Sequence, residues 1–132
     1  MTNLEPVARR PASLPKVVAT RLTVAAYPTA VRYWLGHVWS DLGIDVWKAL
    51  DERLHHFTQE CGRAGWPGDF AVRRECLLAD LTDAAYRTFL KYGARGSFLE
   101  LELGLYKVFY GIVHEIGHET LLSHTLHGGL PE

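Results

Sequence analysis

Apolar residues recur at intervals of three and four along three long segments of this 132-residue chain. Residues at that spacing lie on one face of a helix, so the pattern predicts amphipathic helices near residues 45–61, 69–92 and 97–126. The stripes expected to face a core in the first two segments are Trp47, Leu50, Leu54, Phe57 and Cys61, and then Leu78, Leu81, Ala85, Phe89 and Tyr92. The chain is therefore expected to be all-α.

The third of these segments carries the most specific start signal. Ser97 and Glu100 match a capping box, in which each side chain bonds to the backbone N–H group of the other residue at a helix N terminus. Two glycines from residue 128 onward provide a stop. We therefore expect the longest helix here, buried along Leu105, Phe109, Ile112 and Ile116.

The first third of the chain is less regular. Three prolines and the lack of periodicity predict an irregular tail over residues 1–16, free or laid along a partner. Residues 17–27 are rich in β-branched side chains and leave strand and helix open, with a short helix preferred because no second strand is evident for pairing. Pro28 is expected to open a further helix and Gly43 to end it. The predicted fold is a small all-α bundle of four main helices, with residues 17–132 as a single domain and an irregular Pro-rich N-terminal tail.

Composition excludes several classes of function. The formal net charge of -1 at pH 7 argues against a broad electrostatic grip on nucleic acid, so no nucleic-acid partner is expected. The sequence has no run of about 18 apolar residues, so no membrane span is expected. Cys61 and Cys76 are too few for a disulfide framework and are interpreted as small buried thiols. With no secretion-signal pattern at its start, the chain is expected to be cytoplasmic.

One stretch suggests chemistry, the sequence His-Glu-x-x-His at residues 114–118. A spacing of four puts His114 and His118 on one helix face, one turn apart, where two imidazoles can hold zinc. Glu115 beside them can take a proton from metal-bound water. A stable site needs a third or fourth ligand, which His124 or a residue from another helix or chain would have to supply.

This stretch resembles the signature of zinc-dependent peptidases, and with His124 it is similar to the metzincin motif over about 11 residues. The resemblance implies His114, His118 and His124 as zinc ligands and Glu115 as the base of a hydrolase. The first box is also similar to the histidine boxes of membrane fatty-acid desaturases and to the helix of small regulatory peptidases of mobile elements. The metzincin pattern needs Gly where this chain has Leu121, because the chain must turn before the third histidine.

Helix geometry places the histidine pair away from the core. With His114 at 0° and 100° per residue, the apolar stripe lies at about 160–260° and His118 at about 40°. The pair is therefore expected to face solvent or a second surface. On an unbroken helix, His124 lies at about 280° and points away from the pair.

Glycines give the same helix a second feature. Gly104 and Gly111 lie on the flank of the histidine face, at about 80° and 60°. Each costs about 1 kcal/mol relative to alanine within a helix, but a glycine lets another helix approach closely. We interpret Gly104, Gly111 and Tyr110 as a surface for a partner or for self-association. The alternative is incidental glycine with local bending.

These patterns together predict a small helical interaction, regulatory or accessory subunit that acts through protein–protein contacts. Its partner would be another protein or further copies of itself, in a homo-oligomer or a larger complex, and no cofactor is expected. The alternative is a zinc-binding protein, in its enzymatic form a metal-dependent hydrolase that uses His114, Glu115 and His118.

Overall fold

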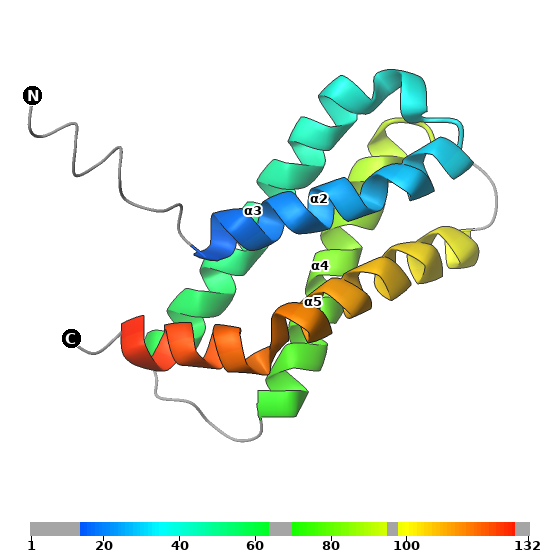
Figure 1. The fold of residues 1–132 in the computed structure, drawn as a ribbon. Coiled ribbons are helices and arrows are strands. Elements are labelled where there is room, and N and C mark those ends of the chain that lie inside the picture. The colour runs from blue at the N-terminus through cyan, green and yellow to red at the C-terminus, as the bar shows by residue number, and fades with distance from the viewer. Residues whose placement is uncertain (1–13, 64–69, 95–97, 129–132) are drawn as a thin grey trace, which may run out of the picture.

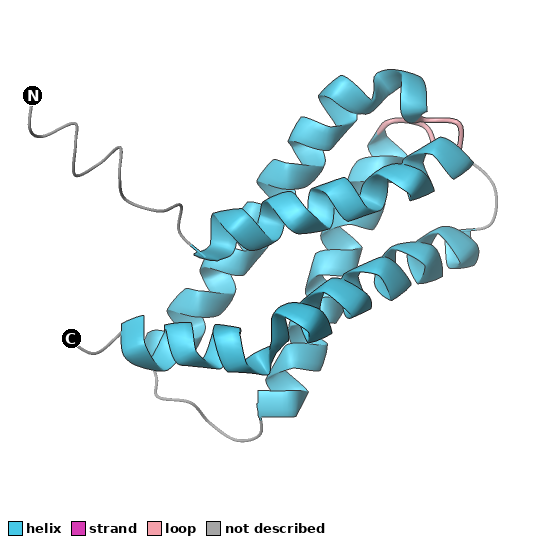
Figure 2. Cartoon of the chain, viewed as in Figure 1, coloured by secondary structure: helices cyan, strands magenta, loops and turns pink. Residues whose placement is uncertain are grey.

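The computed structural model describes the backbone of residues 14–63, 70–94 and 98–128, and the side chains of residues 15–60, 72–94 and 99–115. Figure 2 shows that this part of the chain contains helices and no strand, which confirms the predicted fold class. The elements are α2 (Leu14–Arg32), the short 3₁₀ helix η1 (Gly36–Val38), α3 (Trp39–Arg63), α4 (Phe70–Lys91) and α5 (Phe98–Gly128).

The four long helices form an antiparallel bundle. Each packs against its neighbours in the chain, and α5 closes the ring by packing against α2. Figure 1 shows α2 and α5 in front, with α3 and α4 behind them, and successive helices running in opposite directions. Among the described helices, none is long and apolar enough to cross a membrane.

The core lies between the four helices and is almost entirely aliphatic, with two phenylalanines. The predicted stripes supply much of it, although Trp47, Phe57 and Tyr92 are only partly buried. The largest fully buried side chains are Phe89, Phe109, Leu22, Leu42, Leu50, Leu54, Leu78, Leu81, Leu101, Leu105, Val18 and Val46. Burying a side chain of this size stabilises the fold by roughly 1.5–3 kcal/mol relative to leaving it in water.

The predictions for the second half of the chain are confirmed to within two residues. Helix α4 covers nearly all of the expected segment 69–92, and α5 is the longest helix, as expected for 97–126. Leu105 and Phe109 are fully buried and Ile112 is partly buried. The capping serine and the side chain of Ile116 lie outside the described part of the structure.

The boundary predicted at Pro28 is wrong. Residues 17–27 are helical, and α2 continues through Pro28 to its end at residue 32. A proline within a helix removes one hydrogen bond and crowds the carbonyl four residues before it, here that of Val24. Both Val24 and Pro28 are exposed, so water can bond to the carbonyl that loses its partner. Helix α2 also begins at Leu14, within the expected tail, whose residues 1–13 lie outside the described range.

The chain leaves α2 in a Schellman motif, which is the turn that most often ends a helix with a left-handed residue. The N–H group of Trp34 donates to the carbonyl of Val31 at 3.0 Å, and that of Leu35 donates to the carbonyl of Ala30 at 2.8 Å. The left-handed position is occupied by Trp34, with φ of 64°. Glycine is usual there, because any other residue places its Cβ against the backbone at a cost of roughly 1–2 kcal/mol.

The stop predicted at Gly43 is also wrong, because α3 runs straight through it. A Cβ at Gly43 would lie 3.0 Å from Cε2 of Trp39, so the absent side chain makes room for that indole. The Trp39 ring in turn meets Tyr27 of α2 edge-on, with ring centroids 5.2 Å apart. Gly43 therefore serves the packing of α2 on α3 and does not reverse the chain.

Candidate functional site

His114 lies on α5 at its boundary with α4. Its ring stacks on Tyr110, one turn earlier, with centroids 3.9 Å apart and an angle of 21° between the planes. Its Nε2 lies 3.8 Å from Oε2 of Glu75 on α4 and is buried without a hydrogen-bond partner among the described residues. Because the side chain is only 28% exposed, it faces a second helix surface, which is one of the two outcomes expected from the helix geometry.

Glu75 also holds the phenol of Tyr106. The hydroxyl of Tyr106 donates a hydrogen bond of 3.1 Å to Oε1 of Glu75. Burial raises the pKa of Tyr106 above its usual value, and the hydrogen bond to Glu75 raises this pKa further. Tyr106 therefore stays a neutral donor, and the other oxygen of Glu75 remains directed at His114. Glu75 could not be predicted from the motif, because it lies on a different helix.

Glu115 faces the opposite neighbour of α5. Its Oε1 lies 3.2 Å from Nη2 of Arg21 on α2, and its side chain is 66% exposed. Successive residues of a helix point about 100° apart, so Glu115 is directed to α2 while His114 is directed to α4. The residue predicted as the base and the residue predicted as a ligand therefore contact different helices.

The side chains of His118 and His124, the other two predicted ligands, lie outside the described part of the structure. The backbone around them is described, and α5 remains helical through residue 128. The turn near Leu121 that would bring His124 back to the histidine pair is therefore not formed. Among the side chains that are described, no group of three or more histidine, cysteine or acidic residues lies close enough to share a metal ion.

Gly104 and Gly111 lie beside open space. A Cβ built at either position would meet no atom within 4 Å, so no helix of this bundle approaches them. The close approach suggested by these glycines is therefore not made by any residue that the structure describes. Tyr110, the third residue of the predicted surface, is partly exposed on the same helix.

Further apolar side chains extend this side of α5. Leu99 is 71% exposed, and Leu103 is exposed one turn later. They border a shallow hollow of about 220 Å³ between α4 and α5, lined by Ala79, Thr82, Leu99, Glu102, Leu103 and Tyr106. Leu99 was not predicted, although it lies four residues before Leu103 and therefore on the same side of the helix.

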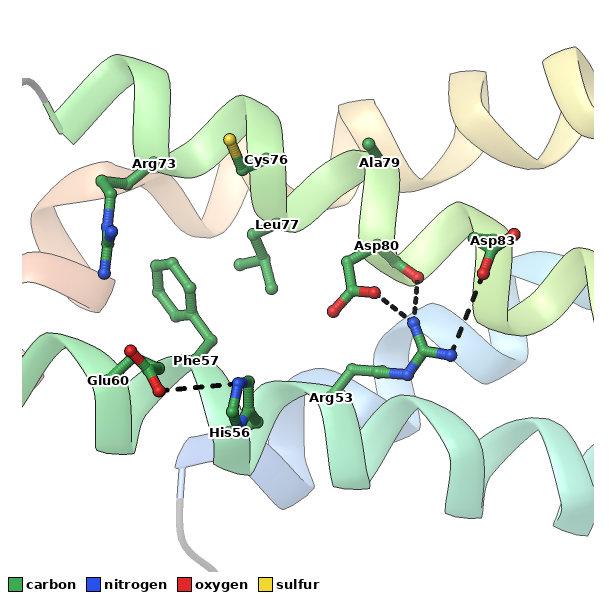
Figure 3. Close-up of a pocket in the computed structure, with 10 residues that line it drawn as sticks. All are labelled: Arg53, His56, Phe57, Glu60, Arg73, Cys76, Leu77, Ala79, Asp80 and Asp83. Carbon is green, nitrogen blue, oxygen red and sulfur yellow. Dashed lines mark hydrogen bonds and ion pairs between the residues drawn. The ribbon is translucent and has the colours of Figure 1, made fainter.

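A groove with a volume of about 730 Å³ lies between α3 and α4. Figure 3 shows the guanidinium of Arg53 reaching from α3 to the carboxylates of Asp80 and Asp83 on α4. The same guanidinium donates to the backbone carbonyl of Asp80 at 3.1 Å, and His56 lies 3.7 Å from Glu60. These charged side chains pair with one another, so the groove is interpreted as an ion-paired seam that joins the two helices.

Cys76 lines the outer part of this groove and is exposed, so its interpretation as a buried thiol is wrong. Figure 3 shows its sulfur directed away from Phe57 and Leu77, which face each other between the helices. In sequence, Cys76 comes between exposed Glu75 and buried Leu77, so it lies at the edge of the buried stripe of α4. The side chain of Cys61 lies outside the described residues.

Comparisons of the chain with protein-family models, curated proteins and solved structures find no match.

Proposed function

We propose that the protein is a non-catalytic interaction subunit that binds another protein along the outer side of α5. The observation that carries the proposal is a row of exposed apolar residues and glycines on α5, with exposed Lys107 among them, that the other described helices leave uncovered. We call it the α5 outer face, and it consists of Leu99, Leu103, Gly104, Tyr110 and Gly111. A helix that is apolar on both sides is typical of one buried on both sides.

The shape of this face suits a helix of the partner. Gly104 and Gly111 are two turns apart, about 10 Å along the axis, and both lie beside open space. A partner helix can approach the backbone of α5 closely along that path, while Leu99, Leu103 and Tyr110 supply apolar contacts at its edge. This is the helix-in-groove mode of recognition, in which an apolar helix face lies along a complementary surface.

Chemical cross-linking in a lysate of the source cells tests the proposal through matched variants. Gly111→Leu fills the open path and Tyr110→Ser removes the aromatic contact, and neither change disturbs the buried core. Val72→Ser is the control, because Val72 is an exposed apolar residue on another helix. The expected result is a partner that cross-links to α5 of the wild-type protein. The cross-link should be absent with both α5 variants and present with Val72→Ser. Equal recovery with all four proteins would refute it.

Zinc binding is a second candidate because one observation favours it. Nε2 of His114 is buried without a hydrogen-bond partner among the described residues and lies 3.8 Å from a carboxylate oxygen of Glu75. A histidine nitrogen and a carboxylate oxygen, both of which zinc accepts as ligands, are therefore close together. Metal analysis of untagged protein, with His114→Ala and Glu75→Gln as matched variants, tests it. If the wild-type protein holds stoichiometric zinc and both variants lose it, the result would support a structural or catalytic zinc site. Weak binding and an unchanged melting temperature in chelator would argue against it.

A further inference from the structure

Trp34 combines two unfavourable features at one position. Its backbone is left-handed, with φ of 64°, and its side chain is 84% exposed. The turn does not require tryptophan, because the end of α4 has the same hydrogen bonds with Gly93 at the equivalent position, with φ of 90°. An outlier of this kind at the surface points to a role in binding.

Trp34 lies just past the end of α2, which carries an apolar stripe on its outer side. Val17, Val24, Tyr27 and Val31 are all exposed, and Val24 is 65% exposed. At 100° per residue, these four positions lie within about 80° of one another on the helix. The opposite side of α2 is buried in the core, so α2 is apolar on both sides.

A hollow lies within the same surface. It is lined by Val24, Tyr27, Gly36 and Trp39 and has a volume of about 400 Å³, which accommodates an indole ring. Its walls are largely apolar, with two aromatic rings and a glycine that adds no side chain. Gly36 in its wall lies two residues after Trp34, so an exposed indole and an apolar hollow occur close together on this surface.

We propose that two copies of this chain associate about a two-fold axis, each placing Trp34 in the hollow of the other. A two-fold contact requires one patch that is complementary to itself, and a protrusion next to a matching hollow meets that requirement. We call this surface the Trp34 patch, and it consists of Val17, Val24, Tyr27, Val31, Trp34 and the walls of the hollow. The association uses α2 and does not depend on the α5 outer face.

The size of the patch agrees with a small dimer interface. A standard interface buries about 800 Å² on each partner, and the five exposed side chains of the stripe supply on the order of 500 Å² of this. Two of the three cations of α2 are paired within the chain, and the third, Arg32, is exposed beside Val31. Lys16 lies 3.3 Å from Asp51, and Arg21 lies 3.2 Å from Glu115.

Sedimentation velocity over a range of protein concentrations tests the proposal. The wild-type chain is expected to show a monomer–dimer equilibrium. Trp34→Gly removes the indole while giving the left-handed position the residue that adopts it most readily, so the monomer should stay folded. Its dimerisation is expected to weaken by at least about tenfold, as for a central aromatic anchor. Val72→Arg on α4 is a control that should dimerise like the wild type.

A mixing experiment tests the reciprocal insertion itself. Val24→Arg fills the hollow but keeps the indole, whereas Trp34→Gly keeps the hollow but lacks the indole. Each variant alone should be largely monomeric, and an equimolar mixture should form heterodimers through the one contact that remains intact. Gly111→Leu should leave dimerisation unchanged, which separates this proposal from binding through α5.

Three results would overturn the proposal. The first is a wild-type chain that stays monomeric at every protein concentration. This includes the case in which the monomer uses Trp34 to bind vesicles of phosphatidylcholine and phosphatidylserine and cosediments with them. The second is a Trp34→Gly chain that dimerises like the wild type while circular dichroism shows it folded. The third is a mixture of the two variants that remains monomeric.

Discussion

Arg21 on α2 and Glu115 on α5 form an ion pair, with Nη2 of the arginine 3.2 Å from Oε1 of the glutamate. The pair links the two helices that close the ring of the bundle. It also determines where the acidic residue of the His-Glu-x-x-His stretch points. A base that activates metal-bound water must lie on the same side of the helix as the ligands, whereas Glu115 is held toward α2 and His114 contacts α4.

The Arg21–Glu115 pair is expected to contribute little to stability. Both side chains are substantially exposed, at 42% and 66%, and water screens their attraction. Glu115→Gln should therefore lower the free energy of unfolding by less than about 1 kcal/mol in urea denaturation, and added salt should shrink the difference. Arg21→Gln should give a similar value, and the double variant should lose less than the sum. A loss above about 2 kcal/mol would indicate a role beyond this ion pair.

Phe109 and Tyr110 are neighbours in sequence with opposite environments. Phe109 is fully buried in the core, so Phe109→Ala should lower the free energy of unfolding by about 3–5 kcal/mol. Tyr110 is exposed, and Tyr110→Ala should cost less than about 1 kcal/mol. Chemical denaturation of both variants measures the contrast. A loss under about 1 kcal/mol for Phe109→Ala would mean that the buried stripe of α5 is misplaced.

Tyr92 should make stability depend on alkaline pH. Its hydroxyl donates a hydrogen bond of 2.5 Å to Oδ2 of Asp45, and this bond, with lesser effects of burial and of the charge on Asp45, raises the pKa of Tyr92 from 10.0 to about 12. A folded pKa above the unfolded one means that this stabilisation is present below pH 10 and is lost as the pH rises toward 12.

Two variants isolate this effect. Tyr92→Phe and Asp45→Asn should each flatten the fall in unfolding free energy between about pH 10 and 12, whereas Tyr110→Phe should not. Denaturation at several pH values measures the slope. An NMR titration of the tyrosine ring carbons should also move the pKa of Tyr92 toward 10.0 when Asp45 is replaced. If the slope is unchanged in Tyr92→Phe, another group is responsible for it.

The two Schellman turns should respond in opposite ways to substitution. Gly93 has φ of 90°, where a side chain is strained although open space surrounds it, so Gly93→Ala should cost about 1 kcal/mol. Trp34→Gly relieves the same strain and should not destabilise the monomer. Thermal denaturation at low protein concentration compares them. If Trp34→Gly unfolds more readily than the wild type under those conditions, the indole contributes to the fold of the monomer.

The helices were predictable where local signals and packing agree. The segments at 69–92 and 97–126 are apolar at helical spacing between clear breaks, and α4 and α5 match them closely. The boundary between α2 and α3 was misplaced because a proline such as Pro28 usually marks the start of a helix and a glycine such as Gly43 its end. Here Pro28 lies on an exposed side where its missing hydrogen bond is tolerated, and Gly43 makes room for an indole from the same helix.

The surfaces were less predictable, because they depend on which helices become neighbours. Helical periodicity placed His114 opposite the core, and the structure places it against α4. The partners of the motif residues are far away in sequence. Glu75 lies 39 residues before His114, and Arg21 lies 94 residues before Glu115. Trp34 was assigned to the interior of a helix, whereas the structure places it in a left-handed turn with an exposed side chain.

The exposure of Trp34 also gives the protein an intrinsic optical reporter. Among the tryptophans whose side chains are described, Trp39 and Trp47 are partly buried, while Trp34 is almost fully in water. Its emission should lie at longer wavelength than theirs, and iodide should quench it first. Whatever covers α2 will shift that emission to the blue and shield it from the quencher, so occupancy can be followed without a label.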